Sequence, residues 1–253
     1  DKMTEAAPAH ARPRIHLMDE IRGFAVLCMI FYHAFYTLAY IYGIDWGMAL
    51  LRFFMPAEPF FAGAFIFISG ISSDLSRSNL KRGAKLFLVA LVVSLATWIV
   101  VPQELIVFGI LHFLSICMML YGLCKPFLDR FRFSWWQILV CALLYACTMD
   151  ISRGVVFFAI QLPDALFQTS FLFPFGIPGP GFRSSDYFPL FPWIFVFFAG
   201  GFFGKLAAGG KFPAFAYKSR IPFLSWMGRH ALILYVVHQP VIYGVTWLLE
   251  LFL

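Results

Sequence analysis

The sequence predicts an all-α integral membrane protein with about seven transmembrane helices around a polar tunnel. Three observations predict this fold. Hydrophobic residues make up 61% of the 253 residues and charged residues only 13%, whereas a soluble domain has about 45–50% and about 25%. The mean hydropathy is +0.82. The third observation is a series of apolar runs close to the ~20 residues that a helix needs to cross ~30 Å of hydrocarbon.

Polar segments separate seven such runs. The second run contains Pro56, Glu58 and Pro59 and the fifth is short, so these two are the least regular. The first 20 residues form a cytoplasmic arm, and residues 21–253 form a single transmembrane domain. The expected spans are 21–42, 53–71, 84–101, 106–124, 135–150, 187–206 and 224–249.

Basic residues are distributed unequally between the segments that connect these spans. With the N-terminus placed inside, 16 of the 19 Lys and Arg residues lie inside, and only Arg52, Arg153 and Arg183 lie outside. Cytoplasmic segments of membrane proteins carry such an excess. The distribution predicts a cytoplasmic N-terminus and, with seven spans, an extracytoplasmic C-terminus. The net charge of +6 is then an orientation signal in a multi-pass protein of the cell membrane, not a sign of nucleic-acid binding.

Residues 151–186 form the one long extracytoplasmic loop. Its segment 171–181 contains three prolines and three glycines and cannot continue as a helix. Irregular backbone at membrane depth is tolerated only where protein or a water-filled cavity covers it. We expect the loop to lie in the interface and re-enter, either as a lid over an outward-facing site or as a turn-rich connector.

Ionisable side chains on the first span form one stripe. Arg22 and His33 are eleven residues apart, which is three turns plus about 20°, so they point the same way and lie ~16 Å apart along the axis. Asp19 lies about 40° to the other side, and Tyr36 and Tyr40 continue the face. Ionisable groups inside a span are costly and by default functional, although a lone histidine can also be a core residue. A neutral imidazole near the midplane suits a general base.

Two further histidines lie in the outer half of the predicted bundle. His112 falls in the fourth span, and His238 falls in the last span and is followed by Gln239. Each is either a core residue or part of a site. Since no paired carboxylate lies at metal-ligand spacing, we expect no metal. Facing histidines can hold a haem, so a bis-histidine haem protein stays open as an alternative.

The end of the second span combines small hydroxyl side chains with basic and amide residues. Such a cluster of hydrogen-bond donors suits phosphate groups, although the same basic residues also fit a plain orientation signal. The cluster comprises Ser69, Ser72, Arg77, Asn79, Lys81 and Arg82.

Several of these segments resemble a known family. Residues 22–33, an arginine followed eleven residues later by a histidine, resemble the first-helix signature of the transmembrane acyltransferase superfamily, and residues 67–70 resemble its Ser-Gly motif. The whole chain more closely resembles the short bacterial members of the heparan-alpha-glucosaminide N-acetyltransferase catalytic-domain family. The matching stretches are 18–23, 69–73, 79–83, 108–112, 185–190, 228–230 and 238–240.

The resemblance implies an enzyme that moves an acyl group, usually acetyl, from cytoplasmic acyl-CoA to an amine or hydroxyl acceptor at the extracytoplasmic side. Acetyl-CoA would be the co-substrate, and the acceptor a small molecule or glycan such as a sugar. Further partners would be the lipid bilayer and, as an open question, a second copy of the chain. The family's lysosomal enzyme carries its proposed active histidine in the first lumenal loop, where this sequence has Asp45 and Trp46. The aminosugar acceptor is therefore not carried over.

The resemblance also implies residue roles. Arg22 would meet the CoA, His33 would be the catalytic base or an acyl relay, and Lys81 and Arg82 would face the CoA phosphates. We expect His33 to act with Arg22 and Asp19, and the Ser69–Arg82 cluster to bind the cofactor. The expected acceptor-binding residues are His112, Asp186, Tyr187, His238 and Gln239.

A small-solute or proton transporter is the alternative function. It would use the same polar tunnel, but transporters typically show inverted repeats or paired broken helices. The sequence shows neither feature.

Overall fold

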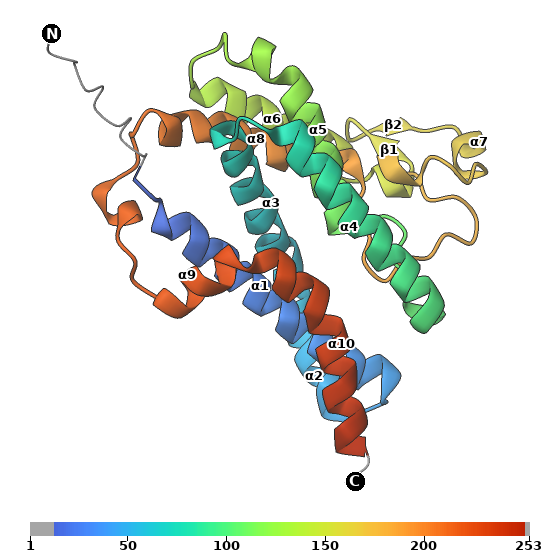
Figure 1. Ribbon diagram of the computed structural model, residues 1–253. Coiled ribbons are helices and arrows are strands. Elements are labelled where there is room, and N and C mark those ends of the chain that lie inside the picture. The colour runs from blue at the N-terminus through green and yellow to red at the C-terminus, as the bar shows by residue number, and fades with distance from the viewer. Residues whose placement is uncertain (1–12, 251–253) are drawn as a thin grey trace, which may run out of the picture.

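The computed structural model describes residues 13–250 of the chain, most of them in α-helices (Figure 1). The long helices are α1 (His16–Tyr36), α3 (Glu58–Leu75), α4 (Asn79–Val100), α5 (Ile110–Leu128), α6 (Trp135–Thr148), α8 (Leu190–Ala208) and α10 (Ala231–Glu250). The shorter elements are α2 (Asp45–Phe54), the strands β1 (Val155–Val156) and β2 (Ile160–Gln161), α7 (Asp164–Phe167) and α9 (Pro222–Arg229).

Seven helical segments among the described residues are long and apolar enough to cross a membrane, which confirms the predicted number of spans. Each of them overlaps one predicted span. Their bounds are His16–Ile41, Asp45–Leu75, Asn79–Val100, Ile110–Leu128, Trp135–Arg153, Leu190–Ala208 and Ala231–Leu248.

The first two spans begin earlier than predicted. The first begins at His16, so the last residues of the predicted arm, 16–20, belong to α1. The second begins at Asp45 instead of residue 53, because α2 continues into α3 through one 3-10 turn, Met55–Ala57. Pro56 and Pro59 each occupy a first-turn position, where the missing backbone N–H removes no helical hydrogen bond. The two prolines therefore start helical segments instead of ending the span.

The prediction of one last helix over 224–249 was wrong, because the chain turns at His230 between α9 and α10. α9 packs against α1 through glycines: a Cβ on Gly23 would meet the Leu224 carbonyl, and a Cβ on Gly228 would meet the Asp19 carbonyl. The carboxylate of Glu20 accepts hydrogen bonds from the backbone N–H groups of Arg220 at 2.6 Å and Ile221 at 2.9 Å. A carboxylate is favourable at a helix N-terminus. These contacts hold α9 to α1 and separate it from α10.

Glycines also permit the close packing of α3 on α8. A Cβ on Gly70 would meet the Phe197 carbonyl, and a Cβ on Gly200 would meet the Phe67 carbonyl. Small residues at helix interfaces allow this approach in membrane proteins. The main core lies beside this pair and includes the fully buried side chains of Phe113 and Tyr121.

The loop 151–186 contains the β1–β2 hairpin, α7 and a 3-10 turn at Phe173–Phe175. As predicted, residues 171–181 form no α-helix. The end of the loop is docked on the chain before α5: the Val107 N–H donates to Ser184 Oγ at 3.1 Å, and the Phe188 N–H donates to the Phe108 carbonyl at 2.9 Å. These bonds place Asp186 at the start of α5. The role of a lid stays a prediction.

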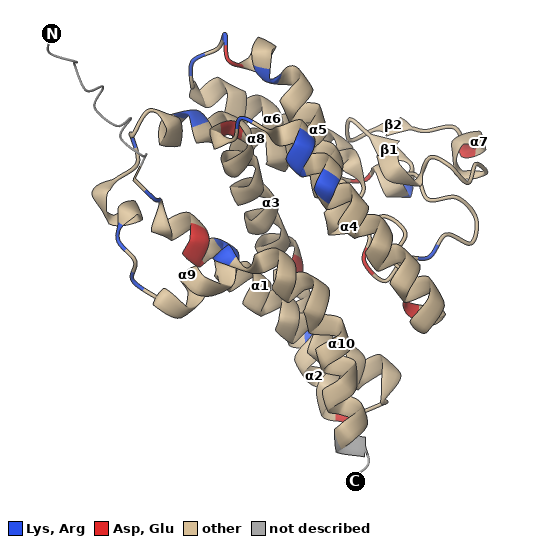
Figure 2. Ribbon diagram, in the orientation of Figure 1, with Lys and Arg blue, Asp and Glu red and all other residues tan. Residues whose placement is uncertain are grey.

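Lys and Arg residues gather at one end of the molecule, where the N-terminal trace, α9 and the α5–α6 connection lie (Figure 2). Lys2 and Arg12, which the inside count includes, lie outside the described residues. The clustering agrees with the charge asymmetry of the sequence. The orientation of this end toward the cytoplasm stays a prediction.

Candidate active site

One cavity has a cationic lining. It measures about 430 Å³ and is bounded by residues of α1, α3, α4, α5, α9 and α10. Its basic side chains are Arg22, Arg82, Lys85 and Arg229, and among the described residues that line it none is acidic. We call it the cationic cavity. Its charge suits an anionic group.

Arg22 is held in position at this cavity. Its Nη2 donates to Ser72 Oγ at 2.6 Å, and its Nη1 lies 3.6 Å from Asp19 Oδ1. Asp19 is buried and also pairs with Arg14 Nε at 2.7 Å. Asp19 therefore contacts and orients Arg22, while its own side chain lines neither this cavity nor the one described next.

The predicted cofactor-binding cluster is divided by the structure. Ser69, Ser72 and Arg82 line the cationic cavity, whereas Arg77 lines a different cavity and Lys81 lines none of those described. Asn79 is buried, and its Nδ2 donates to the Ser73 carbonyl at 2.8 Å.

The geometry of α4 explains this division. Adjacent residues in a helix point ~100° apart, and α4 is rotated so that Arg82 faces the cavity while Lys81 points elsewhere. Lys85, three residues after Arg82, shares its face and lines the cavity. Its i,i+3 spacing from Arg82 was the signal that could have identified it.

A second, smaller cavity of about 130 Å³ contains His33, and we call it the histidine cavity. Its other polar lining residues are Tyr32, Glu58, Ser185, Asp186, Tyr187 and Tyr235. They come from α1, the start of α3, the end of the long loop and α10. Phe65 and Tyr235 line both cavities, so these two side chains form a shared wall.

His33 contacts α10 through two predicted acceptor-binding residues. Gln239 Nε2 lies 2.9 Å from His33 Nδ1, and the ring centroids of His33 and His238 are 5.0 Å apart. His238 Nδ1 lies 2.6 Å from the Tyr235 carbonyl. Since a carbonyl only accepts, Nδ1 carries the proton and Nε2 keeps its lone pair. Among the described residues, that buried Nε2 has no hydrogen-bond partner.

Asp186 connects the loop, α5 and α10. Its Oδ2 accepts from the Tyr235 hydroxyl at 2.5 Å and from the Ile110 N–H at 3.0 Å. A Cβ on Gly109 would collide with this carboxylate, so the glycine permits the approach. Burial raises the pKa of Asp186, although the bonds from Tyr235 and Ile110 act in the opposite direction. Asp186 therefore positions Tyr235 at the wall between the cavities.

Tyr187 and His112 have different surroundings. The Tyr187 hydroxyl donates to the Phe173 carbonyl at 2.6 Å, and burial raises the pKa of Tyr187 to about 12. Its phenol is therefore protonated at neutral pH. His112 lines neither large cavity: its Nε2 lies 3.3 Å from Ser94 Oγ, and its ring packs on Phe108 with centroids 6.0 Å apart.

Sequence reasoning missed several lining residues. Tyr235 lies three residues before His238 and shares its helical face, a spacing that could have identified it. Glu58 stood out as an ionisable residue within a predicted span. Arg229 lines the cationic cavity from α9, but its place depends on the turn between α9 and α10. Within residues 13–250, no group of three His, Cys, Asp or Glu residues is arranged to hold a metal ion.

These features describe an α-helical protein with seven candidate membrane spans among its described residues, in which a cationic cavity adjoins a histidine-containing one. The family described as heparan-alpha-glucosaminide N-acetyltransferase, catalytic, matches residues 14–240, so the chain belongs to this family. This confirms the resemblance found in the sequence. The family is one of transmembrane N-acetyltransferases that use acetyl-CoA as the donor. No curated protein and no solved structure gives a significant match to the chain.

Proposed function

We propose that the chain moves an acetyl group from acetyl-CoA in the cationic cavity to an amine or hydroxyl acceptor, such as that of a sugar, in the histidine cavity. The observation that carries the proposal is the shared wall of Phe65 and Tyr235. Family membership favours this function over a transporter or a haem protein. With the charge-rich end in the cytoplasm, transfer runs from cytoplasmic acetyl-CoA to an extracytoplasmic acceptor.

The cationic cavity supplies what the donor needs. The phosphates of CoA would pair with Arg22, Arg82, Lys85 and Arg229, since arginine and phosphate form charge-assisted and often bidentate hydrogen bonds. Apolar side chains that include Val89 and Leu111 line the same cavity. They suit the less polar arm that carries the thioester toward Tyr235.

His33 would act as the general base. The attacking amine or hydroxyl gives its proton to His33 while its nitrogen or oxygen bonds to the acetyl carbon. The carbon–sulfur bond then breaks, and the CoA thiolate takes the proton from His33. The products are the acetylated acceptor and CoA, and no metal or covalent enzyme intermediate is needed.

The pairing of His33 with Gln239 determines which ring nitrogen of His33 can accept the proton. The oxygen and nitrogen of an amide exchange places by a flip of the side chain. The structure places Gln239 Nε2 against His33 Nδ1; after such a flip, Gln239 Oε1 accepts from His33 Nδ1–H. His33 Nε2 then keeps its lone pair, and His33 Nε2 forms no hydrogen bond with another described residue. Gln239 is then a positioning residue. His238 lies beside the base. Asp186 Oδ1 forms no hydrogen bond with another described residue, so it would be free to accept a hydrogen bond from the substrate that receives the acetyl group.

The test is turnover of labelled acetyl-CoA by the purified protein with a panel of amino sugars, sugars and small amines. We expect acceptor-dependent release of CoA thiol and a labelled product. His33→Ala should lower this rate by about 100-fold or more, the range of general-base catalysis. His230→Ala is the matched control, because His230 lines neither cavity. If wild-type protein neither binds nor consumes acetyl-CoA, the proposed function fails. If His33→Ala keeps full turnover, the assigned base is wrong.

A further inference from the structure

A third cavity lies at the end of α3. It measures about 620 Å³ and is bounded by the ends of α3, α5 and α8 and by the segments that follow them. Two carboxylates line it, Asp74 and Asp129, and we call it the Asp74 cavity. It shares no described lining residue with the other two cavities. Its cations are Arg77, Lys125, Arg132, Lys205 and Lys211.

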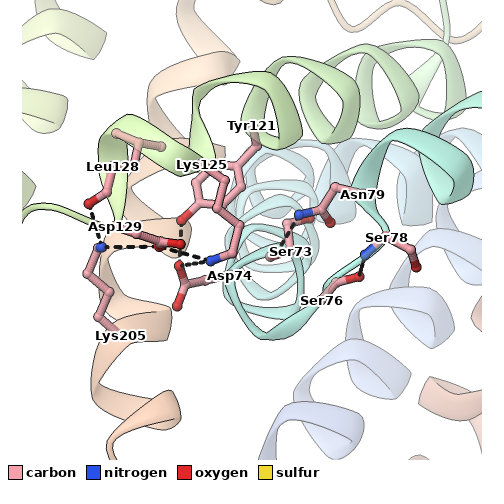
Figure 3. A network of polar contacts seen from close by, with 10 residues as sticks. All are labelled: Ser73, Asp74, Ser76, Ser78, Asn79, Tyr121, Lys125, Leu128, Asp129 and Lys205. Carbon is pink, nitrogen blue, oxygen red and sulfur yellow. Dashed lines mark hydrogen bonds and ion pairs between the residues drawn. The ribbon is translucent and has the colours of Figure 1, made fainter.

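A network of polar contacts neutralises part of this charge (Figure 3). Buried Asp74 accepts from the Tyr121 hydroxyl at 2.8 Å and from Lys125 Nζ at 3.2 Å. Lys125 Nζ also donates to Asp129 at 3.1 Å. Lys205 Nζ donates to the Leu128 carbonyl at 2.7 Å and lies 3.9 Å from Asp129. The two carboxylates are thus matched by two lysines.

Three cations remain around the mouth of the cavity. Arg77 follows α3, Arg132 precedes α6 and Lys211 follows α8, and all three are exposed. None of them forms an ion pair with another described residue. Three converging cations from three separate connections favour a ligand that carries a phosphate group.

The segments that line this cavity continue into an apolar furrow: Trp136 and Phe202 in the furrow are three residues from Phe133 and Lys205 in the cavity, respectively. The furrow lies between α6 and α8, measures about 270 Å³ and is lined by side chains such as Trp136, Leu144 and Phe202. Phe202 lies one helical turn before Lys205 on α8. From Trp136 to Leu144 the furrow follows α6 for ~12 Å. We call it the α6–α8 furrow.

Exposed tryptophans mark the level at which the cavity and the furrow meet. Trp135 and Trp136 begin α6, and both are exposed. Tryptophan is enriched at the membrane–water interface. The cations therefore lie at headgroup level, and the furrow runs from there toward the bilayer centre.

We propose that the Asp74 cavity and the α6–α8 furrow together bind one anionic glycerophospholipid. The lipid phosphate lies among Arg77, Arg132 and Lys211, and one acyl chain lies in the furrow. Basic pockets between transmembrane helices at headgroup level bind acidic lipid headgroups. A free phosphate would leave the furrow unused, and a zwitterionic lipid offers no net charge to the three cations. The site is separate from the proposed transfer reaction and does not depend on it.

The test uses phosphatidylglycerol with brominated acyl chains, added to the full-length protein in detergent. Bromine quenches nearby tryptophan, so we expect saturable quenching, and Trp136→Phe should remove the part that comes from the furrow. The triple variant Arg77→Gln, Arg132→Gln, Lys211→Gln should weaken the binding about tenfold or more, because each cation contributes to the attraction of an anionic headgroup. The matched control neutralises the three basic residues of the opposite end, Arg52, Arg153 and Arg183, and should bind like the wild type.

Three outcomes would overturn the proposal. The first is equal affinity of the triple variant and the wild type. The second is equal quenching by brominated phosphatidylcholine. The third is complete displacement of the lipid by millimolar inorganic phosphate or by acetyl-CoA, which would assign the cavity to a free anion or to the cofactor. Because the three cations are exposed and unpaired within the described residues, the triple variant should keep the wild-type elution profile and helical circular dichroism.

Discussion

Arg82 and Lys81 are neighbours in the chain, but only Arg82 lines the cationic cavity. We expect Arg82→Gln to raise the KM for acetyl-CoA about tenfold, since a hydrogen bond to a charged group contributes ~1.5–3 kcal/mol, and to change kcat little. Lys81→Gln is the matched control and should leave both constants near the wild-type values. Steady-state kinetics over a range of acetyl-CoA concentrations measures both. Equal effects of the two substitutions would show that acetyl-CoA does not bind in the cationic cavity.

Asp186 should make the stability of the protein depend on pH. Because its folded-state pKa is raised above the ~3.9 of an exposed aspartate, the folded protein binds this proton more tightly than the unfolded chain. Stability therefore falls as the pH rises from the unfolded pKa through the folded one.

Asp186→Asn removes this dependence but keeps an oxygen that accepts from Ile110 and Tyr235. We expect its Tm to exceed that of the wild type by a few degrees near pH 8 and to approach it as the pH falls below the ~3.9 of the unfolded chain, where the carboxyl is protonated in both states. Thermal denaturation in detergent at several pH values measures the difference. A variant with a lower Tm than the wild type near pH 8 and an equal one at low pH would show that the charge of Asp186 stabilises the fold.

At the scale of single residues, sequence patterns found side chains that share one helix. The alignment of Arg22 with His33 depended only on helical geometry, and each of them lines a cavity. The sequence could not show which helices are neighbours. His112 has the polarity and depth of a site residue, yet it packs beside Ser94 and Phe108. The position of Arg82 and not Lys81 in the cavity depends in the same way on the rotation of α4.

At the scale of helices, the packing of α9 on α1 depends on two glycines. A Cβ on Gly228 would meet the Asp19 carbonyl, whereas a Cβ on Gly244 of α10 would meet nothing within 4 Å. We expect Gly228→Ala to destabilise the protein by ~1–3 kcal/mol, the usual cost of overpacking. Gly244→Ala should be neutral or slightly stabilising, because alanine is the better helix former.

Thermal denaturation of the two alanine variants tests this contact. A loss of stability for Gly228→Ala alone would identify the α1–α9 interface as the cause. Equal melting temperatures would mean that α9 can move away from α1 at little cost. The same measurement on Gly23→Ala checks the contact from the α1 side.

Hydropathy located all seven spans because each span must fill the thickness of a bilayer. It did not reveal the turn between α9 and α10, since both helices carry many apolar residues and neither proline nor glycine comes directly after Arg229. The position of α9 depends on a residue about 200 positions away, through the hydrogen bonds from Arg220 and Ile221 at its start to Glu20. A helix boundary that depends on a distant carboxylate is beyond local sequence patterns.

At the scale of the whole molecule, the charge asymmetry predicts the orientation in the membrane. In a background with the five cysteines replaced, Lys211→Cys should react with a membrane-impermeant maleimide only after the cells are opened. Arg183→Cys should react in intact cells. Both residues are exposed, so both should react in opened cells, which is the control. The reverse pattern would invert the direction of acetyl transfer.

The size of the histidine cavity has a consequence for the choice of acceptor. Its volume of about 130 Å³ is close to the roughly 150 Å³ of an engineered cavity that holds one benzene molecule. That space accommodates an acetyl group and the atom that attacks it, but not a complete sugar ring as well. The body of the acceptor would therefore stay outside and present only its reactive tip to His33. The enzyme would then select acceptors by the width of the group that carries the reacting amine or hydroxyl. Molecules that differ in the rest of their structure would all be acetylated.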